Sequence, residues 1–301
     1  VIMHARTGKI EYVYNREFAL RRQFPPGSIA KVWSTAVFLE NRQLFAYNPF
    51  RPVQCNGKFF YKHGSFSKGD VMSFNLPFDK RENKRYFRCA LRRGHGLVSM
   101  RTALIKSCNV YYLTIAAKQP KMFYKKLMKM WKLNKNTGAR LQSVQELPNR
   151  YIRSLTNFQS AASVIGEGGS ILVSPLKVTQ TFAALFSNSP LLSPYEIKYH
   201  RILTQHSLPV TIQTRNIITT SLSRVLYAGT MRKLYVKNKR VTLIAGKTGT
   251  GTHYRKKYAT HGWNVIVFIY AKKKYVMTTF VYRGSGSKEA LKLSRTVLNA
   301  L

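Results

Sequence analysis

Strand-like segments occupy both ends of this chain, and this distribution limits its possible folds more than any other feature. Residues 1–15, VIMHARTGKIEYVYN, predict two strands joined by a turn at Thr7-Gly8. Near the other end, KRVTLIAGKTGT, GWNVIVFIY and KYVMTTFVYR are three β-rich runs, and Lys288–Leu301 closes the chain as a helix. Strands at both ends with helices between them predict an α/β (α+β) fold whose sheet is assembled from the two termini.

Helical periodicity fills the region between these strands. After Pro25-Pro26-Gly27, apolar residues recur at helical spacing, namely Ile29, Val32, Trp33, Ala36 and Val37. The segment KMFYKKLMKMWKL, residues 121–133, carries a single apolar stripe, which favours a core-facing helix over a membrane-surface helix. Ser174 and Pro175 predict the N-cap and first residue of a further helix.

Residues 46–96 are rich in glycine and proline and predict an irregular insert, not a second core. We therefore expect a single domain over residues 1–301 with a loop-rich insert at about 46–96.

The basic residues greatly outnumber the acidic ones. Lys and Arg number 51 against 10 Asp and Glu, a formal charge of +41, spread along the whole chain. Such a field favours a polyanionic neighbour, either nucleic acid, anionic lipid headgroups or acidic wall polymers. No readout motif supports specific nucleic-acid binding, and no apolar run approaches the roughly 18 residues of a membrane span.

The cysteines Cys55, Cys89 and Cys108 are odd in number and cannot form a complete disulfide framework. Reduced and mostly packed thiols are the favoured interpretation. Two alternatives stay open. Cys55 and Cys89 could pair in an oxidising compartment, or these two could form a zinc site with His63 and His95.

Ser28 stands at the start of the first predicted helix, with Lys31 three positions later. Residues i and i+3 share a helix face, so the lysine could serve as the base for a serine nucleophile. Helix capping is the alternative role for Ser28. Ser-x-x-Lys also occurs at Ser65/Lys68, Ser174/Lys177 and Ser285/Lys288, so the pattern alone is weak.

Two further segments supply matching chemistry. Ser107 and Asn109 offer a hydroxyl for proton relay and an amide for holding a substrate, although Ser73 and Asn75 repeat that spacing. In the predicted strand ending GKTGT, alternation places Thr248 and Thr250 on one face and Lys247 on the other. The two hydroxyls could then bind a substrate carboxylate while Lys247 approaches Ser107.

In this order, Ser28-x-x-Lys31, Ser107-x-Asn109 and Lys247-Thr248-Gly249 resemble the three motifs of the penicillin-binding transpeptidases and serine β-lactamases. The likeness extends to PPGSIAK, GHGLVSMRTALIKSCNVYY and GEGGSILVSPLKVTQTFAAL and so covers nearly the whole chain. The motif separations suit the transpeptidase domain, and Cys55-x-Gly57 with Gly94-His95-Gly96 lean toward the monofunctional, elongation-type branch that acts in cell shape. The resemblance implies a central antiparallel sheet flanked by helices, with a helical subdomain.

The resemblance also implies the roles of the site residues. Ser28 would be acylated, Lys31 would be its base, and Ser107 would relay the proton to the leaving amine. Asn109 would orient the substrate and Lys31. The substrate carboxylate would meet Lys247, Thr248, Gly249 and Thr250, and the amides of Ser28 and Thr250 would form the oxyanion hole.

A D,D-transpeptidase that cross-links peptidoglycan stem peptides and binds β-lactams, without a cofactor, is the function so implied. Cell-wall synthesis proteins and anionic wall or membrane polymers are its expected partners, with an extracytoplasmic location and an upstream membrane anchor. A D,D-carboxypeptidase or class D-like β-lactamase, or a catalytically silent basic scaffold, remain alternatives. For hydrolysis, the sequence shows no deacylating carboxylate near the motifs, since Glu167 lies in a glycine turn assigned to another region.

The charge suggests one further hypothesis about the base. Positive surroundings disfavour a protonated lysine, so we expect Lys247 and the general field to lower the pKa of Lys31.

Overall fold

A five-stranded antiparallel sheet contains strands from both ends of the chain. The computed structural model describes residues 1–61, 76–142, 145–147, 155–167, 169–196, 206–252 and 260–301. The strands are β1 (Ile2–His4), β2 (Ile10–Tyr12), β9 (Val241–Thr252), β10 (Thr260–Tyr270) and β11 (Lys273–Val281), in the order β2-β1-β11-β10-β9. Ile2 pairs with Met277, which confirms the predicted joining of the two termini in one sheet.

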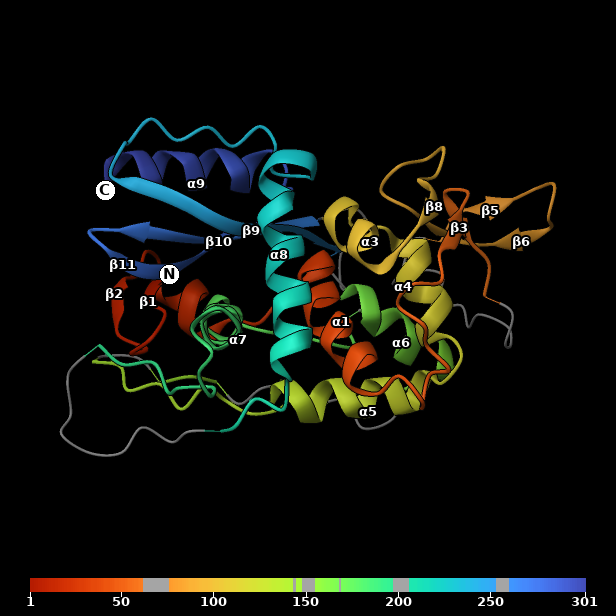
Figure 1. Cartoon of the computed structure of the whole chain (residues 1–301), viewed down its shortest axis with the longest axis horizontal. Helices are drawn as coiled ribbons and strands as arrows, with labels where there is room; N and C mark the ends of the chain where they lie inside the picture. The colour runs from red at the N-terminus through yellow and green to blue at the C-terminus, as the bar shows by residue number, and fades with distance from the viewer. Residues whose placement is uncertain (62–75, 143–144, 148–154, 168, 197–205, 253–259) are drawn as a thin grey trace.

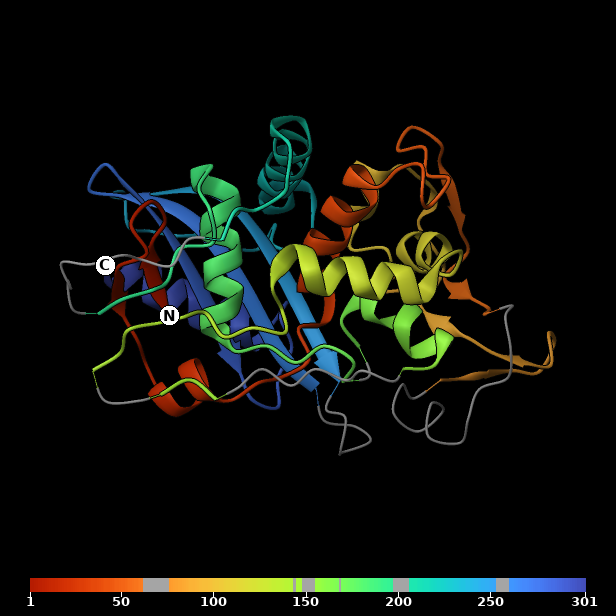
Figure 2. The same cartoon turned by 90° about the horizontal axis from the view of Figure 1, so that it is seen from below.

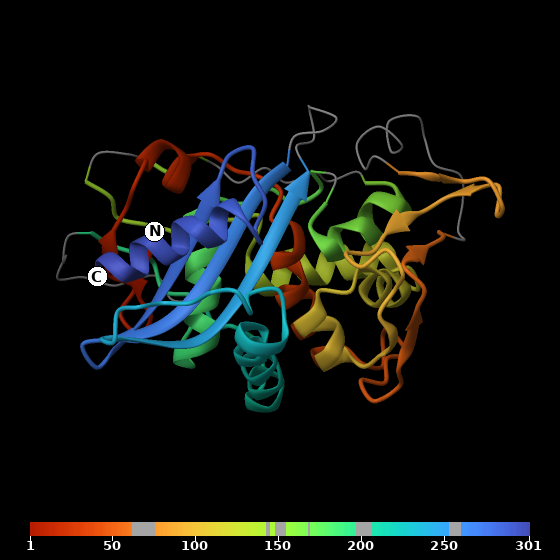
Figure 3. The ribbon, with the colours of Figure 1, turned by 90° about the horizontal axis from the view of Figure 1, so that it is seen from above.

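Helices cover both faces of this sheet. Helix α9 (Glu289–Ala300) packs on β10 and β11, and α7 (Pro175–Ser187) packs on the opposite face against β1, β10 and β11. Figures 2 and 3 show the two faces in turn, with α7 in front of the sheet in one view and α9 in the other. Ser174 caps α7 as predicted, because its side chain accepts a hydrogen bond from the Lys177 amide.

A second group of helices lies beside the β9 edge (Figure 1). Its members are α1 (Ala30–Glu40), α3 (Met100–Lys106), α4 (Asn109–Ala116), α5 (Pro120–Trp131), α6 (Asn157–Ala162) and α8 (Ile212–Ala228). The chain also has three shorter helical turns. Two of them, η2 (Gly27–Ile29) and η3 (Ser163–Ile165), lie against α1, and η1 (Glu17–Arg21) packs on α7. Of these elements, η2 and α8 contact β9 directly.

Helix α1 is buried at the centre of the helical region. Trp33 is fully buried, and its Nε1 donates a hydrogen bond to Thr181 Oγ1 of α7 at 3.1 Å. Trp131 of α5 donates from its Nε1 to the Trp33 carbonyl oxygen at 3.1 Å. The apolar stripe of α5 is buried with it, so the prediction of a core-facing helix is confirmed.

The insert is built from short strand pairs at the end of the molecule away from both termini (Figure 1). The pairs are β3 (Val53–Cys55) with β8 (Gly96–Val98), β4 (Lys58–Phe59) with β7 (Phe87–Arg88), and β5 (Phe78–Asp79) with β6 (Lys84–Arg85). Buried side chains of its described part, including Phe87 and Cys89, join the same hydrophobic cluster as Trp33.

Within the described ranges, we find no helix that has both the length and the apolar character needed to span a membrane.

Candidate active site

Ser28 lies in η2, where the chain turns from Pro26 into helix α1. Gly27 has a φ of +54°, and a Cβ atom at this position would clash with the Thr250 carbonyl group. Its amide donates a hydrogen bond to the Gly166 carbonyl oxygen at 3.1 Å. Glycine therefore lets the backbone before the serine pack directly on β9, a contact that any side chain would prevent.

Lys31, one turn further along α1, is fully buried beside Ser28. Its Nζ lies 2.9 Å from Ser28 Oγ, 2.8 Å from the Ser107 carbonyl oxygen and 2.5 Å from Asn109 Oδ1. A neutral amine has two N–H donors and one lone pair. If Ser107 and Asn109 accept the two N–H groups, the lone pair is left for the hydroxyl proton of Ser28.

The surroundings of Lys31 favour this neutral form. Burial lowers the pKa of Lys31 to about 8, whereas the thiol groups of Cys89 and Cys108 and the Glu167 carboxyl act to raise it. The predicted direction is confirmed, but the predicted cause is wrong, because desolvation and not positive surroundings produces the shift. Repulsion acts on the other lysine: burial lowers the pKa of Lys247 well below its ordinary value, and the Lys31 charge lowers it further.

The turn between α3 and α4 brings the second motif to the same place. Ser107 ends α3 in the left-handed conformation, with φ 59° and ψ 44°, and Asn109 begins α4. This sparsely populated conformation directs the Ser107 carbonyl oxygen to Lys31. The Asn109 amide nitrogen Nδ2 donates to the Arg88 carbonyl oxygen at 2.8 Å, which fixes the orientation of Oδ1.

Strand β9 supplies the third motif. Lys247 Nζ donates to Ser107 Oγ at 3.0 Å, so the two lysines contact the same serine. Thr248 Oγ1 lies 2.5 Å from Thr230 Oγ1, and Thr250 Oγ1 accepts from the Gly286 amide at 3.1 Å. Both threonine hydroxyls thus already have partners within the chain, and their contact with a substrate carboxylate stays a prediction.

Gly249 lies between these threonines, where the strand passes close to the turn that carries Ser28. A Cβ atom there would approach the Pro26 carbonyl oxygen to 2.7 Å and Ile29 Cγ1 to 2.9 Å. Close packing therefore favours glycine at position 249, and this holds independently of any contact with substrate.

The other motif copies in the described part of the chain do not form such a cluster. Lys177 Nζ donates to Gln180 Oε1 at 3.1 Å, and Ser174 caps its helix. Ser285 Oγ donates to Glu289 Oε2 at 2.8 Å. The pairs Ser65/Lys68 and Ser73/Asn75 lie outside the described residues.

Glu167 is a residue that the sequence analysis placed away from the three motifs. Its Oε2 accepts a hydrogen bond from the Thr252 amide at the end of β9, at 3.0 Å, and its charge interacts with that of Lys31. Burial raises the pKa of Glu167 to about 7. The expectation that the Glu167 turn belongs to a region away from the motifs is therefore wrong, because this turn folds against the Ser28 segment.

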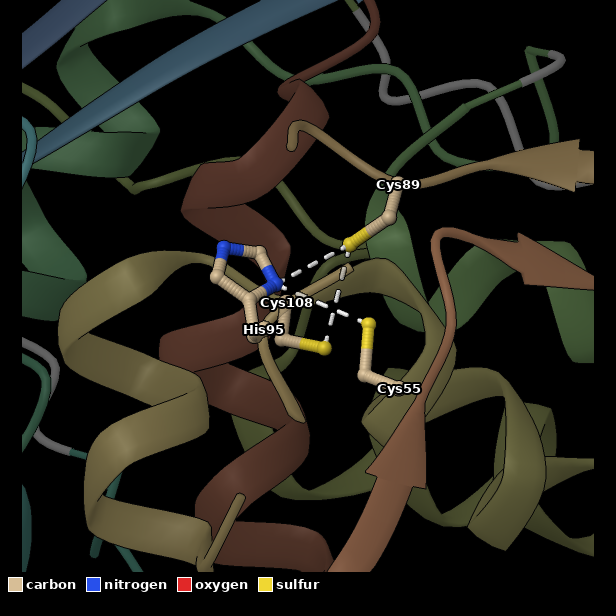
Figure 4. Close-up of side chains that lie close together, drawn as sticks. All are labelled: Cys55, Cys89, His95 and Cys108. Atoms are coloured by element: carbon tan, nitrogen blue, oxygen red, sulfur yellow. Dashed lines mark hydrogen bonds between the residues drawn. The ribbon is translucent and has the colours of Figure 1, made fainter. Parts of the chain in front are cut away.

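A second cluster of reactive side chains includes Cys108, the middle residue of the Ser107–Asn109 turn (Figure 4). It consists of Cys55, Cys89, His95 and Cys108, whose ligand atoms all lie within 4.8 Å of one another. All three cysteines are free and buried, so the packed state is confirmed and the Cys55–Cys89 disulfide is not formed. In the other alternative, a zinc site, Cys108 takes the place expected of His63, which lies outside the described residues.

The distances within this cluster suit a tetrahedral metal ion. Cys89 Sγ lies 3.8 Å from Cys108 Sγ and 3.4 Å from His95 Nδ1, and Cys55 Sγ lies 3.6 Å from His95 Nδ1. Tetrahedral Zn²⁺ with bonds of about 2.3 Å to sulfur and 2.0–2.1 Å to nitrogen separates its ligands by about 3.8 Å and 3.6 Å. The backbone N–H of Asn109 also donates a hydrogen bond to Cys89 Sγ at 3.3 Å, which joins the cluster to the active-site turn.

We expect protein purified without a chelator to carry about one Zn²⁺ per chain, and His95→Gln to lose most of it. At free Zn²⁺ of about 100 times Kd, binding adds about 2.7 kcal/mol to the free energy of unfolding. Metal analysis and thermal unfolding with and without a chelator measure both effects, with His206→Gln as a control outside the cluster. Unfolding that neither zinc nor chelator changes, in protein without metal, would contradict the expectation.

Comparison with known proteins gives a family and a fold. A sequence model described as "Penicillin binding protein transpeptidase domain" matches residues 1–301. Stage V sporulation protein D of Bacillus subtilis (strain 168) is 23% identical over 269 residues, which cover 85% of this chain and 37% of that protein. The chain thus spans little more than a third of this relative's length.

Two solved structures have the same fold. The imipenem acyl-enzyme complex of penicillin-binding protein A from M. tuberculosis matches with a TM-score of 0.75 and 16% identity, over 100% of this chain and 72% of the other. A complex between PBP2 and MreC from Helicobacter pylori matches with a TM-score of 0.71 and 20% identity, over 100% of this chain and 60% of the matched chain. The predicted antiparallel sheet flanked by helices is confirmed by the structure and by these neighbours.

Proposed function

Because this chain belongs to the penicillin-binding protein transpeptidase domain family, we propose that it is one serine D,D-transpeptidase domain over residues 1–301. Its substrates would be the stem peptides of peptidoglycan, and β-lactams would be its covalent inhibitors. The observation that carries the proposal is the position of Lys31 Nζ, 2.9 Å from Ser28 Oγ and hydrogen-bonded to both ends of the Ser107–Asn109 turn.

Acylation is the first half-reaction. Lys31 accepts the Ser28 hydroxyl proton as Oγ attacks the carbonyl carbon between the two terminal D-Ala residues. The amides of Ser28 and Thr250 stabilise the developing oxyanion. The C–N bond then breaks, and the proton reaches the departing D-Ala amine through Ser107, whose Oγ lies 3.2 Å from Lys31 Nζ and 3.0 Å from Lys247 Nζ.

Transfer is the second half-reaction. An amine of a neighbouring stem peptide attacks the acyl carbon and gives up a proton to Lys31 through Ser107. The bond to Ser28 Oγ then breaks, and Oγ takes that proton from Lys31. Asn109 and the residues Lys247 to Thr250 would hold the donor peptide in place during both steps. None of these steps requires a cofactor.

Water as the acceptor gives the second candidate, a D,D-carboxypeptidase or class D-like β-lactamase. The observation that favours it is Glu167, which places a carboxyl beside the Ser28 turn. A penicilloyl adduct that lasts for hours would support transfer to an amine, whereas loss within minutes would support hydrolysis.

The setting of the domain follows from its family. Transpeptidase domains of this kind work outside the cytoplasm, and we propose an anchoring segment upstream of residue 1. The Helicobacter pylori complex between PBP2 and MreC suggests that this domain also works beside cell-wall synthesis proteins. The formal charge of +41 would favour binding to anionic wall or membrane polymers.

The test is turnover of a peptide ending in D-Ala-D-Ala, with and without an added D-amino acid as acceptor. We expect release of D-Ala and, with the acceptor, formation of the transpeptidation product. A folded protein that releases no D-Ala and forms no penicillin adduct, yet is retained on an anionic polymer, would support the silent scaffold instead.

A further inference from the structure

We propose that Glu167 is a specificity residue for the donor peptide, binding a cationic side chain on the residue that precedes D-Ala-D-Ala. This inference rests on the proposed function, since it concerns the peptide that acylates Ser28. It assigns a chemical class, an amine-bearing side chain, to a position that the three motifs leave undefined.

Three contacts fix Glu167 at the end of the third-motif strand. The Gly166 carbonyl oxygen accepts from the Gly27 amide at 3.1 Å, immediately before Ser28. The Thr252 amide donates to Glu167 Oε2 at 3.0 Å, and Ser170 Oγ donates to the Glu167 carbonyl oxygen at 3.3 Å. The carboxylate is therefore held beside the last residue of β9 on the segment that adjoins the nucleophile.

The spacing along β9 relates this carboxylate to the donor peptide. A strand rises about 3.3 Å per residue, so Thr252 lies about 7 Å beyond Thr250. In an extended peptide, the same distance separates the C-terminal D-Ala from the residue that precedes D-Ala-D-Ala. A donor running antiparallel to β9, with its carboxylate at Lys247 to Thr250, therefore presents that residue's side chain near Glu167.

The charge balance of the site indicates the kind of side chain. The two lysines, Lys31 and Lys247, are its buried bases, and the whole chain has 10 acids for 51 basic residues. Within the described ranges, Glu167 is the carboxylate whose charge interacts with Lys31. An ammonium group that enters the site is repelled by these positive charges and attracted by the Glu167 carboxylate.

The position of Glu167 also argues against a role for it at the acceptor amine. The acceptor attacks from where the leaving D-Ala stood, beside Ser107 and Lys247, since both amines share one path to the acyl carbon. Glu167 lies at the other end of the motif, beyond Thr250. Its carboxylate is therefore placed to contact the acyl part of the donor, which stays bound in both half-reactions.

The experiment compares two donor peptides that differ by one charge. Nα-acetyl-L-Lys-D-Ala-D-Ala has a free side-chain amine, and its Nα,Nε-diacetyl analogue does not. We expect kcat/KM for D-Ala release to favour the free amine by about tenfold in the parent, and Glu167→Gln to remove that preference. Glu11→Gln, which removes an exposed carboxylate from β2 at the opposite edge of the sheet, is the matched control.

Each outcome has a distinct meaning. Loss of the preference in Glu167→Gln with unchanged penicillin acylation supports the proposal. A preference that survives Glu167→Gln overturns it, as does an equal slowing of both peptides, which would assign Glu167 to the chemistry itself. Failure of the parent to release D-Ala from either peptide or to form a penicillin adduct would reject the proposed function instead.

Discussion

Replacing Ser28 with alanine should abolish covalent labelling by penicillin, lowering the acylation rate at least about 10⁴-fold. The hydroxyl is the atom that would form the ester, and no neighbouring group replaces it: Lys31 Nζ lies 2.9 Å away but is positioned to accept a proton, not to be acylated. Intact-protein mass after incubation with penicillin measures the effect, as one adduct on the parent and none on the variant.

The chain contains its own control for this experiment. Ser174 also precedes a lysine by three residues, but its side chain caps helix α7. Ser174→Ala should cost about 1 kcal/mol in stability, as for other lost N-caps, and keep the full adduct. An adduct that persisted in Ser28→Ala would place the nucleophile elsewhere.

Replacing Lys31 with methionine should lower the acylation rate by about 10³–10⁴-fold, because the variant keeps the shape of the side chain but cannot accept the proton. In the parent, the basic form must be present for attack. With the pKa of Lys31 lowered to about 8, the acylation rate should therefore fall about tenfold per pH unit below pH 8 and level off above it. Stopped-flow acylation by a chromogenic cephalosporin across pH measures both effects.

Lys177 is a matched control for this variant. It is buried, and burial lowers the pKa of Lys177 to about 8 as well, yet its Nζ binds Gln180 and not a serine. Lys177→Met should retain the rate and the pH profile of the parent. A pH profile in the parent that titrates no lower than a free lysine would refute Lys31 as the base.

Much of this architecture could be predicted from local patterns. Strands near Ile10 and Val265 and a helix after Ser28 follow from periodicity and turn residues, and the structure contains each of them. The meeting of Ser28, Lys31 and Lys247 was predicted through family likeness. Helical spacing accounts only for the contact between Ser28 and Lys31, whereas Lys247 reaches the site through the pairing of β9 with β10.

The parts that escaped prediction depend on contacts between distant segments. Nothing local to Glu167 shows that its glycine turn lies against Gly27, because this contact joins segments that are far apart in the sequence, through a backbone hydrogen bond and close packing of Gly166 on Gly27. Cys108 was a missed signal of another kind. It stands between Ser107 and Asn109 in the sequence. With Ser107 in the left-handed conformation, Ser107 and Asn109 contact Lys31, whereas the Cys108 thiol contacts Cys89.

The joining of both ends of the chain in one sheet also sets the order of events during synthesis. Ile2 cannot pair with Met277 until the segment between them has been synthesised, and such distant pairings fold slowly. A nascent chain therefore contains Ser28 and Lys31 long before it contains Lys247. Copies that stop before β9 would carry Ser28 and Lys31 without Lys247, so the three motifs come together only after residues 241–281 have been added.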